Sequence, residues 1–264
     1  MATVHEICRV LEELAPTGLA EPWDNVGLLL GRRGSRVTRL MTCLTLTERV
    51  AGEAIREGVQ MVVTHHPIFF RATRRLTDET AEGRLVMTLS EAGIAVYSPH
   101  TAFDSAICGI NQSLAEAMGL RDIHSLKGRI DGQAEGAGRH GRLAAGMSGE
   151  EFLGLVASVV GAKWLQASMS GPRRIERVGI ACGAAGDFLE DARRAGCDTF
   201  VTGEARFHTA IESEANGMNL VLMGHYASER PAIVALASRL REIVPGVECL
   251  ASQEDRDPFE VRKY

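Results

Sequence analysis

Short, continuous apolar runs take turns along the chain with segments whose apolar positions have a helical period. Short apolar runs flanked by charged or turn residues are typical of buried strands. Runs with apolar positions three and four residues apart that end in glycine predict helices. The strands predicted in this way cover residues 39–46, 60–64, 94–98, 177–182, 198–202 and 218–223. The helices predicted between them cover residues 48–58, 80–93, 186–196 and 205–217.

The order strand–helix–strand–helix–strand therefore occurs twice, and part of the sequence repeats with it. Residues 36–65 align with 174–203 without a gap, with identities that include Gly58/Gly196. Alternation of this kind implies right-handed βαβ crossovers and a largely parallel sheet in each half. We predict an α/β fold with two related α/β domains from an internal duplication. The first is placed at residues 1–126 and the second at 127–264, with the alternative that the C-terminal segment packs back on the first.

A glycine- and arginine-rich stretch, residues 127–143, lies between the halves. It contains GAGRHG (136–141), which resembles a phosphate loop but lacks the strand–loop–helix frame that such a loop needs. We predict a connection or hairpin here. The next segment, SGEEFLGLVASVVG (148–161), begins with a Ser–x–x–Glu capping box and has helical periodicity.

Composition limits the class of protein. The chain is 45% hydrophobic and 24% charged, which favours a packed globular core. No apolar run is long enough to span a membrane, and no signal peptide begins the chain, so a cytoplasmic location is expected. A net charge of −5 without a Lys/Arg block argues against nucleic acid as the main partner. Six cysteines without a C-x-x-C pair are expected to be reduced, mostly buried thiols.

Metal-capable side chains follow the ends of four predicted strands. In parallel α/β sheets, ligands bind beyond the carboxyl ends of the strands, so these side chains are expected at one edge. They are His65 and His66 after 60–64, His100 and Asp104 after 94–98, Glu204 and His208 after 198–202, and His225 and Glu229 after 218–223.

Two of these pairs have the same four-residue spacing. The members of His100/Asp104 and of His225/Glu229 share one face if a helical turn begins there, so each pair can converge on one ion. A carboxylate can bridge two cations, and imidazole supplies neutral nitrogen to either. Hydrolytic two-metal sites hold their ions on the order of 3.5–4 Å apart. We therefore predict a two-metal centre in the cleft between the two domains.

Other polar residues are open to two interpretations. Glu204 aligns with His66 in the repeat, so it is expected either to support the metals or act as a general base, or to be an ordinary acid at a helix N-terminus. Asp24 and Asn25 are expected to line the mouth of the site or to form a turn. The residues expected to be exposed bystanders are His5, His124, Asp255, Asp257 and, with substrate contact as its alternative, His140.

These residues together resemble the Nif-three-like dinuclear metal-centre family, often named GTP cyclohydrolase type 2 homologues. The resemblance covers almost the whole chain, in the stretches EPWDNVGLLLG (21–31), VVTHHPIFF (62–70), YSPHTAFDSAICGIN (97–111), GCDTFVTGEARFH (196–208), GHYASE (224–229) and SQEDRDPF (252–259). It implies two domains of related fold and a homohexamer. Its metal ligands fall on His65, His66, Asp104, His225 and Glu229, and His100 matches a family position near the metals. The chain departs from the family at CGAAG (182–186) and at GAGRHG.

The residues and the resemblance are compatible with two functions. The first is a metal-dependent hydrolase acting on a nucleotide, similar to a GTP cyclohydrolase, with two divalent ions of zinc, iron, manganese, cobalt or nickel. Its proton-transfer groups would be Glu204, His100 or His208. The second is a non-catalytic metal-binding scaffold, metal-trafficking factor or regulatory protein, which uses the same ligands but needs no general base.

Overall fold

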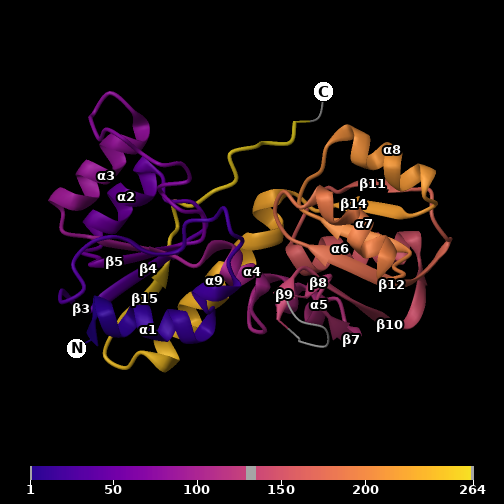
Figure 1. The fold of residues 1–264 in the computed structure, drawn as a ribbon, viewed down its shortest axis with the longest axis horizontal. Helices are drawn as coiled ribbons and strands as arrows, with labels where there is room; N and C mark the ends of the chain where they lie inside the picture. The colour runs from indigo at the N-terminus through magenta and orange to yellow at the C-terminus, as the bar shows by residue number, and fades with distance from the viewer. Residues whose placement is uncertain (1, 129–134, 263–264) are drawn as a thin grey trace. The chain divides into compact units, whose positions relative to one another are not determined.

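The computed structural model describes residues 2–128 and 135–262, and it divides into two compact units (Figure 1). Unit 1 comprises Met1–Phe103 and Ala232–Tyr264, and unit 2 comprises Asp104–Pro231. The division differs from the boundary at 126/127 expected from the sequence. It falls within two helices that continue from one unit into the other, α4 (His100–Ser105) and α9 (His225–Ile243).

Unit 1 is built on a five-stranded sheet in the order β15-β4-β5-β6-β2. Its strands are β2 (Gly27–Leu30), β4 (Arg39–Cys43), β5 (Met61–Thr64), β6 (Ala95–Ser98) and β15 (Glu248–Ala251). All neighbours pair in parallel except β2, which runs antiparallel to β6. The C-terminal β15 pairs with β4, so the end of the chain completes the sheet begun by the N-terminal half.

Helices cover both faces of this sheet. They are α1 (Val4–Leu14), α2 (Glu48–Arg56), α3 (Ala81–Glu91) and the C-terminal part of α9, with a short η1 (Thr17–Leu19) and a strand pair β1 (Ala2–Thr3) and β3 (Arg36–Val37) beside them. In Figure 1, α2 and α3 lie on one side of the sheet and α1 and α9 on the other. Parallel strands buried on both faces explain why each apolar run lacks alternation.

Unit 2 is built on a six-stranded sheet in the order β11-β14-β13-β12-β10-β7. Its strands are β7 (Leu120–His124), β10 (Arg139–Ser148), β11 (Gln166–Met169), β12 (Arg174–Ala181), β13 (Thr199–Thr202) and β14 (Asn219–Leu222), with a separate pair β8 (Lys127–Gly128) and β9 (Gly136–Ala137). Its helices are α5 (Ile110–Ala117), α6 (Gly149–Val160), η2 (Gly186–Phe188), α7 (Leu189–Arg194) and α8 (Phe207–Ala215).

The second sheet is mixed, which corrects the expectation of a largely parallel sheet in each half. Only β12, β13 and β14 pair in parallel, whereas β7, β10 and β11 join them as antiparallel strands. No apolar run predicts these strands, because β7 and β10 carry charged and small residues at their positions. Both sheets still share a βαβαβ core, and the predicted α/β fold is confirmed. The internal duplication stays a prediction.

The described part of the glycine-rich stretch forms the strand pair β8–β9 and the start of β10. Residues 129–134 lie outside the described part. Arg139 opens β10 and is fully buried. The guanidinium donates to the carbonyl oxygens of Ser105, Ala106, Gly136 and Gly138 and to the side chain of Gln112. A buried charge needs such full satisfaction, so this arginine ties β9 and β10 to the segment before α5.

Candidate functional site

In unit 1, three histidines come from two neighbouring strand ends. His65 and His66 follow β5, where their backbone amides donate to the carbonyl oxygens of Cys43 at 3.0 Å and Leu44 at 2.9 Å. The chain after β5 therefore stays paired with the chain after β4 beyond the end of the sheet. His100 follows β6, the next strand in the sheet, and begins α4.

The three imidazoles form one cluster. One ring nitrogen from each of His65, His66 and His100 can be chosen so that all three lie within 4.8 Å of one another. The ring centroids are 5.2–5.7 Å apart, and His65 is 1% exposed. Three neutral imidazole nitrogens at this spacing form a donor set that transition metals and zinc accept.

Asp24 orients His100. Its side chain is fully buried, and its Oδ1 accepts a hydrogen bond from the Nδ1 of His100 at 2.8 Å while Oδ2 accepts from the backbone and hydroxyl of Thr101. A carboxylate on Nδ1 fixes the tautomer and leaves Nε2 directed elsewhere, as in carboxylate–histidine–metal arrangements. His100 also has a positive φ of 28°, a strained conformation for a non-glycine residue. The aspartate from the predicted turn is therefore a supporting residue of the cluster.

Asp24 also predicts a pH-dependent contribution to stability. Burial acts to raise its pKa, but the hydrogen bonds from His100 and Thr101 outweigh burial and lower the pKa to about 2. Because the folded-state pKa lies below the unfolded value of about 3.9, this stabilisation is present above that pH and is lost as the pH falls toward 2. Asp24→Asn is expected to cost about 2 kcal/mol at neutral pH. Denaturant unfolding at pH 7 and pH 3 measures the cost, which should shrink at pH 3; an equal cost at both contradicts this origin.

Other contacts hold the loops around the histidines. The hydroxyl of Thr45 lies 2.7 Å from Nδ1 of His66, and Ser98 donates to the carbonyl oxygen of His65 at 2.6 Å. Asp255, expected in a solvated turn, is instead buried and accepts from the backbone amide of Leu44 at 2.5 Å. The C-terminal segment thus supports Leu44, whose carbonyl oxygen accepts the hydrogen bond from the amide of His66. Asp257 is exposed, as expected.

Two exposed aromatic side chains adjoin the histidine cluster. Trp23 and Phe70 are each 61% exposed, and their rings lie 5.8 Å apart. Each also meets the ring of His100, at 6.1 Å for Trp23 and 6.3 Å for Phe70. Large aromatic rings left in water beside a polar cluster offer a surface on which a flat ligand can stack.

In unit 2, His225 begins α9 and shares a helix face with Glu229, as the four-residue spacing predicts. Its Nε2 lies 3.1 Å from Oε2 of Glu229, while its Nδ1 donates to Oε1 of Glu204 at 2.6 Å. Burial acts to lower the pKa of His225, but the hydrogen bonds and charges of the two carboxylates raise it to about 9. The surroundings therefore favour positive charge at this position, whether a proton or a metal cation.

The loops after β12, β13 and β14 are joined to one another around this histidine. The amide of Glu204 donates to the carbonyl oxygen of Gly183 at 3.0 Å, and the amide of Gly183 lies 3.0 Å from Oγ of Ser228. Gly183 has a φ of +65°, and a Cβ placed on it would collide with Oε1 of Glu229. Glycine at 183 thus leaves the space that the carboxylate of Glu229 occupies.

Asp104 and His208 have different surroundings. The side chain of Asp104 accepts a hydrogen bond from the thiol of Cys182 at 3.3 Å, and full burial together with the charges of Asp104 and Glu229 raises the pKa of that thiol. Cys182, expected only as a buried thiol, therefore contacts a predicted ligand. His208 is exposed, and its ring packs against that of Phe207.

The structure thus brings together two sets of the predicted residues, each within one unit: His65, His66 and His100 in unit 1, and His225, Glu229 and Glu204 in unit 2. Sequence reasoning did not identify Asp24 as the partner of His100, nor Thr45, Gly183 and Cys182. The one available signal was that Asp24 and Asn25 form a polar pair just before an apolar run. All six cysteines are free thiols, and no helix in the described ranges is long and apolar enough to cross a membrane.

Known proteins resemble this chain over its length. The sequence model of the family described as Duf34/NIF3 (NGG1p interacting factor 3) matches residues 2–258. A Clostridium perfringens protein named GTP cyclohydrolase 1 type 2 homolog is 34% identical over 97% of this chain and 98% of its own length. A Schizosaccharomyces pombe protein named Protein NIF3 homolog is 31% identical, with 95% of each chain covered.

Solved structures show the same fold. A Staphylococcus aureus hypothetical protein superposes with a TM-score of 0.88 at 25% identity, covering 98% of this chain and 99% of its own. A Bacillus cereus protein related to NIF3 has a TM-score of 0.87 at 21% identity, with 99% of each chain covered.

Proposed function

This chain belongs to the DUF34/NIF3 family, and we propose that it binds two divalent metal ions and uses them to hydrolyse a nucleotide. The proposed ligands are His65, His66, Asp104, His225 and Glu229. The observation that carries the proposal is that the fold of each unit holds a set of imidazoles or carboxylates close together. Such preorganisation lowers the cost of ordering ligands on binding.

The donor chemistry fits a metal. The clusters offer imidazole nitrogen and carboxylate oxygen, with no thiolate among the proposed ligands, a combination that suits zinc, iron, manganese, cobalt or nickel. The Nδ1 atom of His225 donates a hydrogen bond to Glu204, and the Nδ1 atom of His100 donates one to Asp24. Such a bond leaves the Nε2 atom of each ring available to bind a metal. A pair of divalent ions would supply Lewis acidity, polarising a substrate oxygen and making water a stronger nucleophile.

Around such ions, the chain's own residues would bind and orient the substrate. Trp23 and Phe70 provide an aromatic surface suited to a purine or other flat base beside His100. The name of the Clostridium perfringens relative, GTP cyclohydrolase 1 type 2 homolog, supports a nucleotide as the substrate class. Glu204 is 53% exposed and lies on Nδ1 of His225, so it is placed either to orient that ring or to move a proton.

Glu204→Gln separates catalysis from metal binding. The amide oxygen of glutamine can still accept from Nδ1 of His225, so bound metal measured by elemental analysis is expected to remain. If Glu204 moves a proton, nucleotide turnover should fall by about 100-fold or more. A phosphate- and formate-release screen across nucleoside triphosphates measures turnover, with Glu214→Gln on exposed α8 as the matched control.

The second candidate is a metal-binding scaffold or trafficking protein without catalysis. The hydrogen bond between Glu204 and His225 favours it, because an acid already committed to orienting a ligand need not be a general base. On this alternative, Glu204→Gln leaves every functional readout unchanged as long as metal stays bound. The homohexamer implied by the family is a further proposal, and native mass spectrometry of the purified chain tests it.

A further inference from the structure

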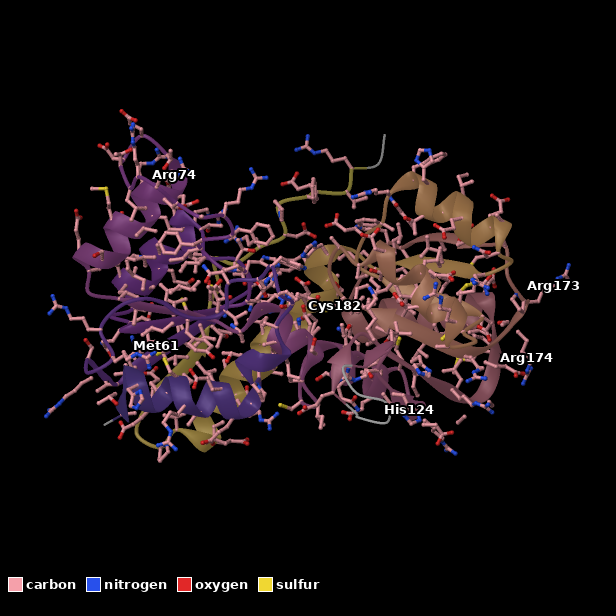
Figure 2. All side chains as sticks on the ribbon, viewed as in Figure 1. Met61, Arg74, His124, Arg173, Arg174 and Cys182 are labelled. Carbon is pink, nitrogen blue, oxygen red and sulfur yellow. The ribbon has the colours of Figure 1, made fainter. Side chains whose placement is uncertain are left out.

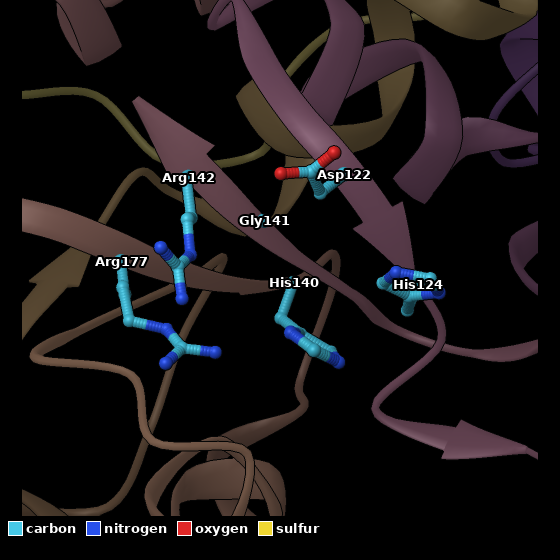
Figure 3. A pocket seen from close by; sticks show the side chains of 6 residues that line it. All are labelled: Asp122, His124, His140, Gly141, Arg142 and Arg177. Carbon is cyan, nitrogen blue, oxygen red and sulfur yellow. The ribbon is translucent and has the colours of Figure 1, made fainter. Parts of the chain in front are cut away.

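A second polar site lies in unit 2, on the sheet formed by β7, β10 and β12. Figure 3 shows a pocket there in which the guanidinium groups of Arg142 and Arg177 reach toward the same space, with the ring of His140 beside them. The lining residues are Asp122, His124, His140, Gly141, Arg142 and Arg177, and the cavity is about 210 Å³. None of these residues belongs to the proposed metal centre.

Strand register places like charges side by side in this region. Arg142 on β10 is directly opposite Arg177 on β12 and directly opposite Arg121 on β7. A row of three arginines therefore crosses three adjacent strands. Like charges directly opposite one another destabilise a sheet, so this arrangement costs stability unless an anion neutralises it. Among the residues that the structure describes, none of the three guanidiniums forms an ion pair.

A β-bulge in β7 places a second histidine, His124, opposite His140. Counting inward from the Arg121–Arg142 pair, regular pairing would place Ile123 opposite His140, but the structure pairs His124 with His140. The extra residue is accommodated by Asp122, whose φ of +52° is left-handed. Bulges and strained residues of this kind recur where a side chain is redirected for binding.

The two histidines meet as a result. Their ring centroids are 5.7 Å apart. Burial lowers the pKa of His140, and so do the nearby His124 and Arg177. The positive charge of Arg177, one of the causes of this shift, favours an anion beside His140. Asp122 is the one carboxylate among the lining residues, and it forms no ion pair with either arginine in the described structure.

We propose that this pocket binds a small oxyanion of the phosphate class, either inorganic phosphate or the phosphate group of a small metabolite. Paired guanidiniums present the planar donor geometry that phosphate oxygens accept, and the imidazoles add further N–H donors. The cavity is smaller than the roughly 300–1,000 Å³ of sites for drug-sized ligands, which suits one phosphate group rather than an extended nucleic-acid backbone.

Calorimetric titration of the purified protein with inorganic phosphate tests the proposal. Arg142→Gln with Arg177→Gln is expected to weaken binding at least about tenfold, because two charge-assisted hydrogen-bond donors are removed. The matched control is Arg173→Gln with Arg174→Gln, which removes the same charge from side chains that project from the surface of unit 2 (Figure 2). The control should stay within about twofold of the parent.

Two further arms make the result decisive. Glycerol phosphate in place of inorganic phosphate distinguishes a metabolite's phosphate group from the free ion, and tighter binding of the ester assigns the former. Nuclear magnetic resonance of the ring nitrogens should show His124 and His140 shifting on titration in the parent and not in Arg142→Gln/Arg177→Gln. The proposal is overturned by an absence of saturable binding of either anion. It is equally overturned if binding survives that double variant but is lost with His65→Ala/Glu229→Ala, which would assign the phosphate to the metal centre.

Discussion

His65→Ala combined with Glu229→Ala is expected to abolish stoichiometric metal while leaving a folded chain. The variant removes one proposed ligand from each of the two clusters, a side chain that is 1% exposed in unit 1 and one that is 3% exposed in unit 2. Loss of an outer-shell partner alone costs about 10–100-fold in metal affinity, so removal of both proposed ligands should exceed that range. Elemental analysis of the purified variant, with circular dichroism for folding, measures the outcome.

The control for this variant carries the same residue types at exposed positions. His5→Ala with Glu214→Ala should keep the metal content of the parent, because neither side chain belongs to a cluster. If the His65/Glu229 variant retains stoichiometric metal, the ligand assignment is wrong. If it loses metal and the phosphate-class pocket still binds its anion, the two sites are independent, as the structure suggests.

Gly183→Ala should lower both stability and metal content, because the added methyl group is unfavourable for two reasons. A left-handed conformation costs about 1–2 kcal/mol for a residue with a Cβ. The new Cβ also collides with the carboxylate of Glu229, which must move away from Nε2 of His225. Both a lower free energy of unfolding and a lower metal content are expected, measured by denaturant unfolding and by elemental analysis.

Comparison with Gly217→Ala separates the steric effect on Glu229 from the backbone cost. Gly217 follows α8 with a φ of +62° and has nothing within 4 Å of an added Cβ, so its substitution carries the backbone cost alone. Metal content should therefore fall in Gly183→Ala and stay unchanged in Gly217→Ala. Equal metal content in the two variants would show that Glu229 adjusts without loss of a ligand position.

Local sequence patterns were sufficient for much of the architecture. Strands such as β5 and β13, and helices such as α2 and α6 with its capping box, lie where the periodicity predicts them. The burial of one helix face or of a whole strand depends on the apolar residues of that segment alone, so the pattern over a short stretch of sequence predicts it. The four-residue spacing of His225 and Glu229 is equally local, and the structure brings their side chains together as predicted.

The tertiary structure decided whatever depends on residues far apart in the chain. Asp24 meets His100 across 76 positions, Cys182 meets Asp104 across 78, and Asp255 meets Leu44 across 211. The antiparallel strands of unit 2 and the bulge that aligns His124 with His140 belong to the same class. Packing decides which loops come together, and this decides which residues form such pairs. The hydrophobic periodicity of a single segment cannot predict them. Sequence alone therefore located the chemical groups, while folding chose the neighbours that orient them.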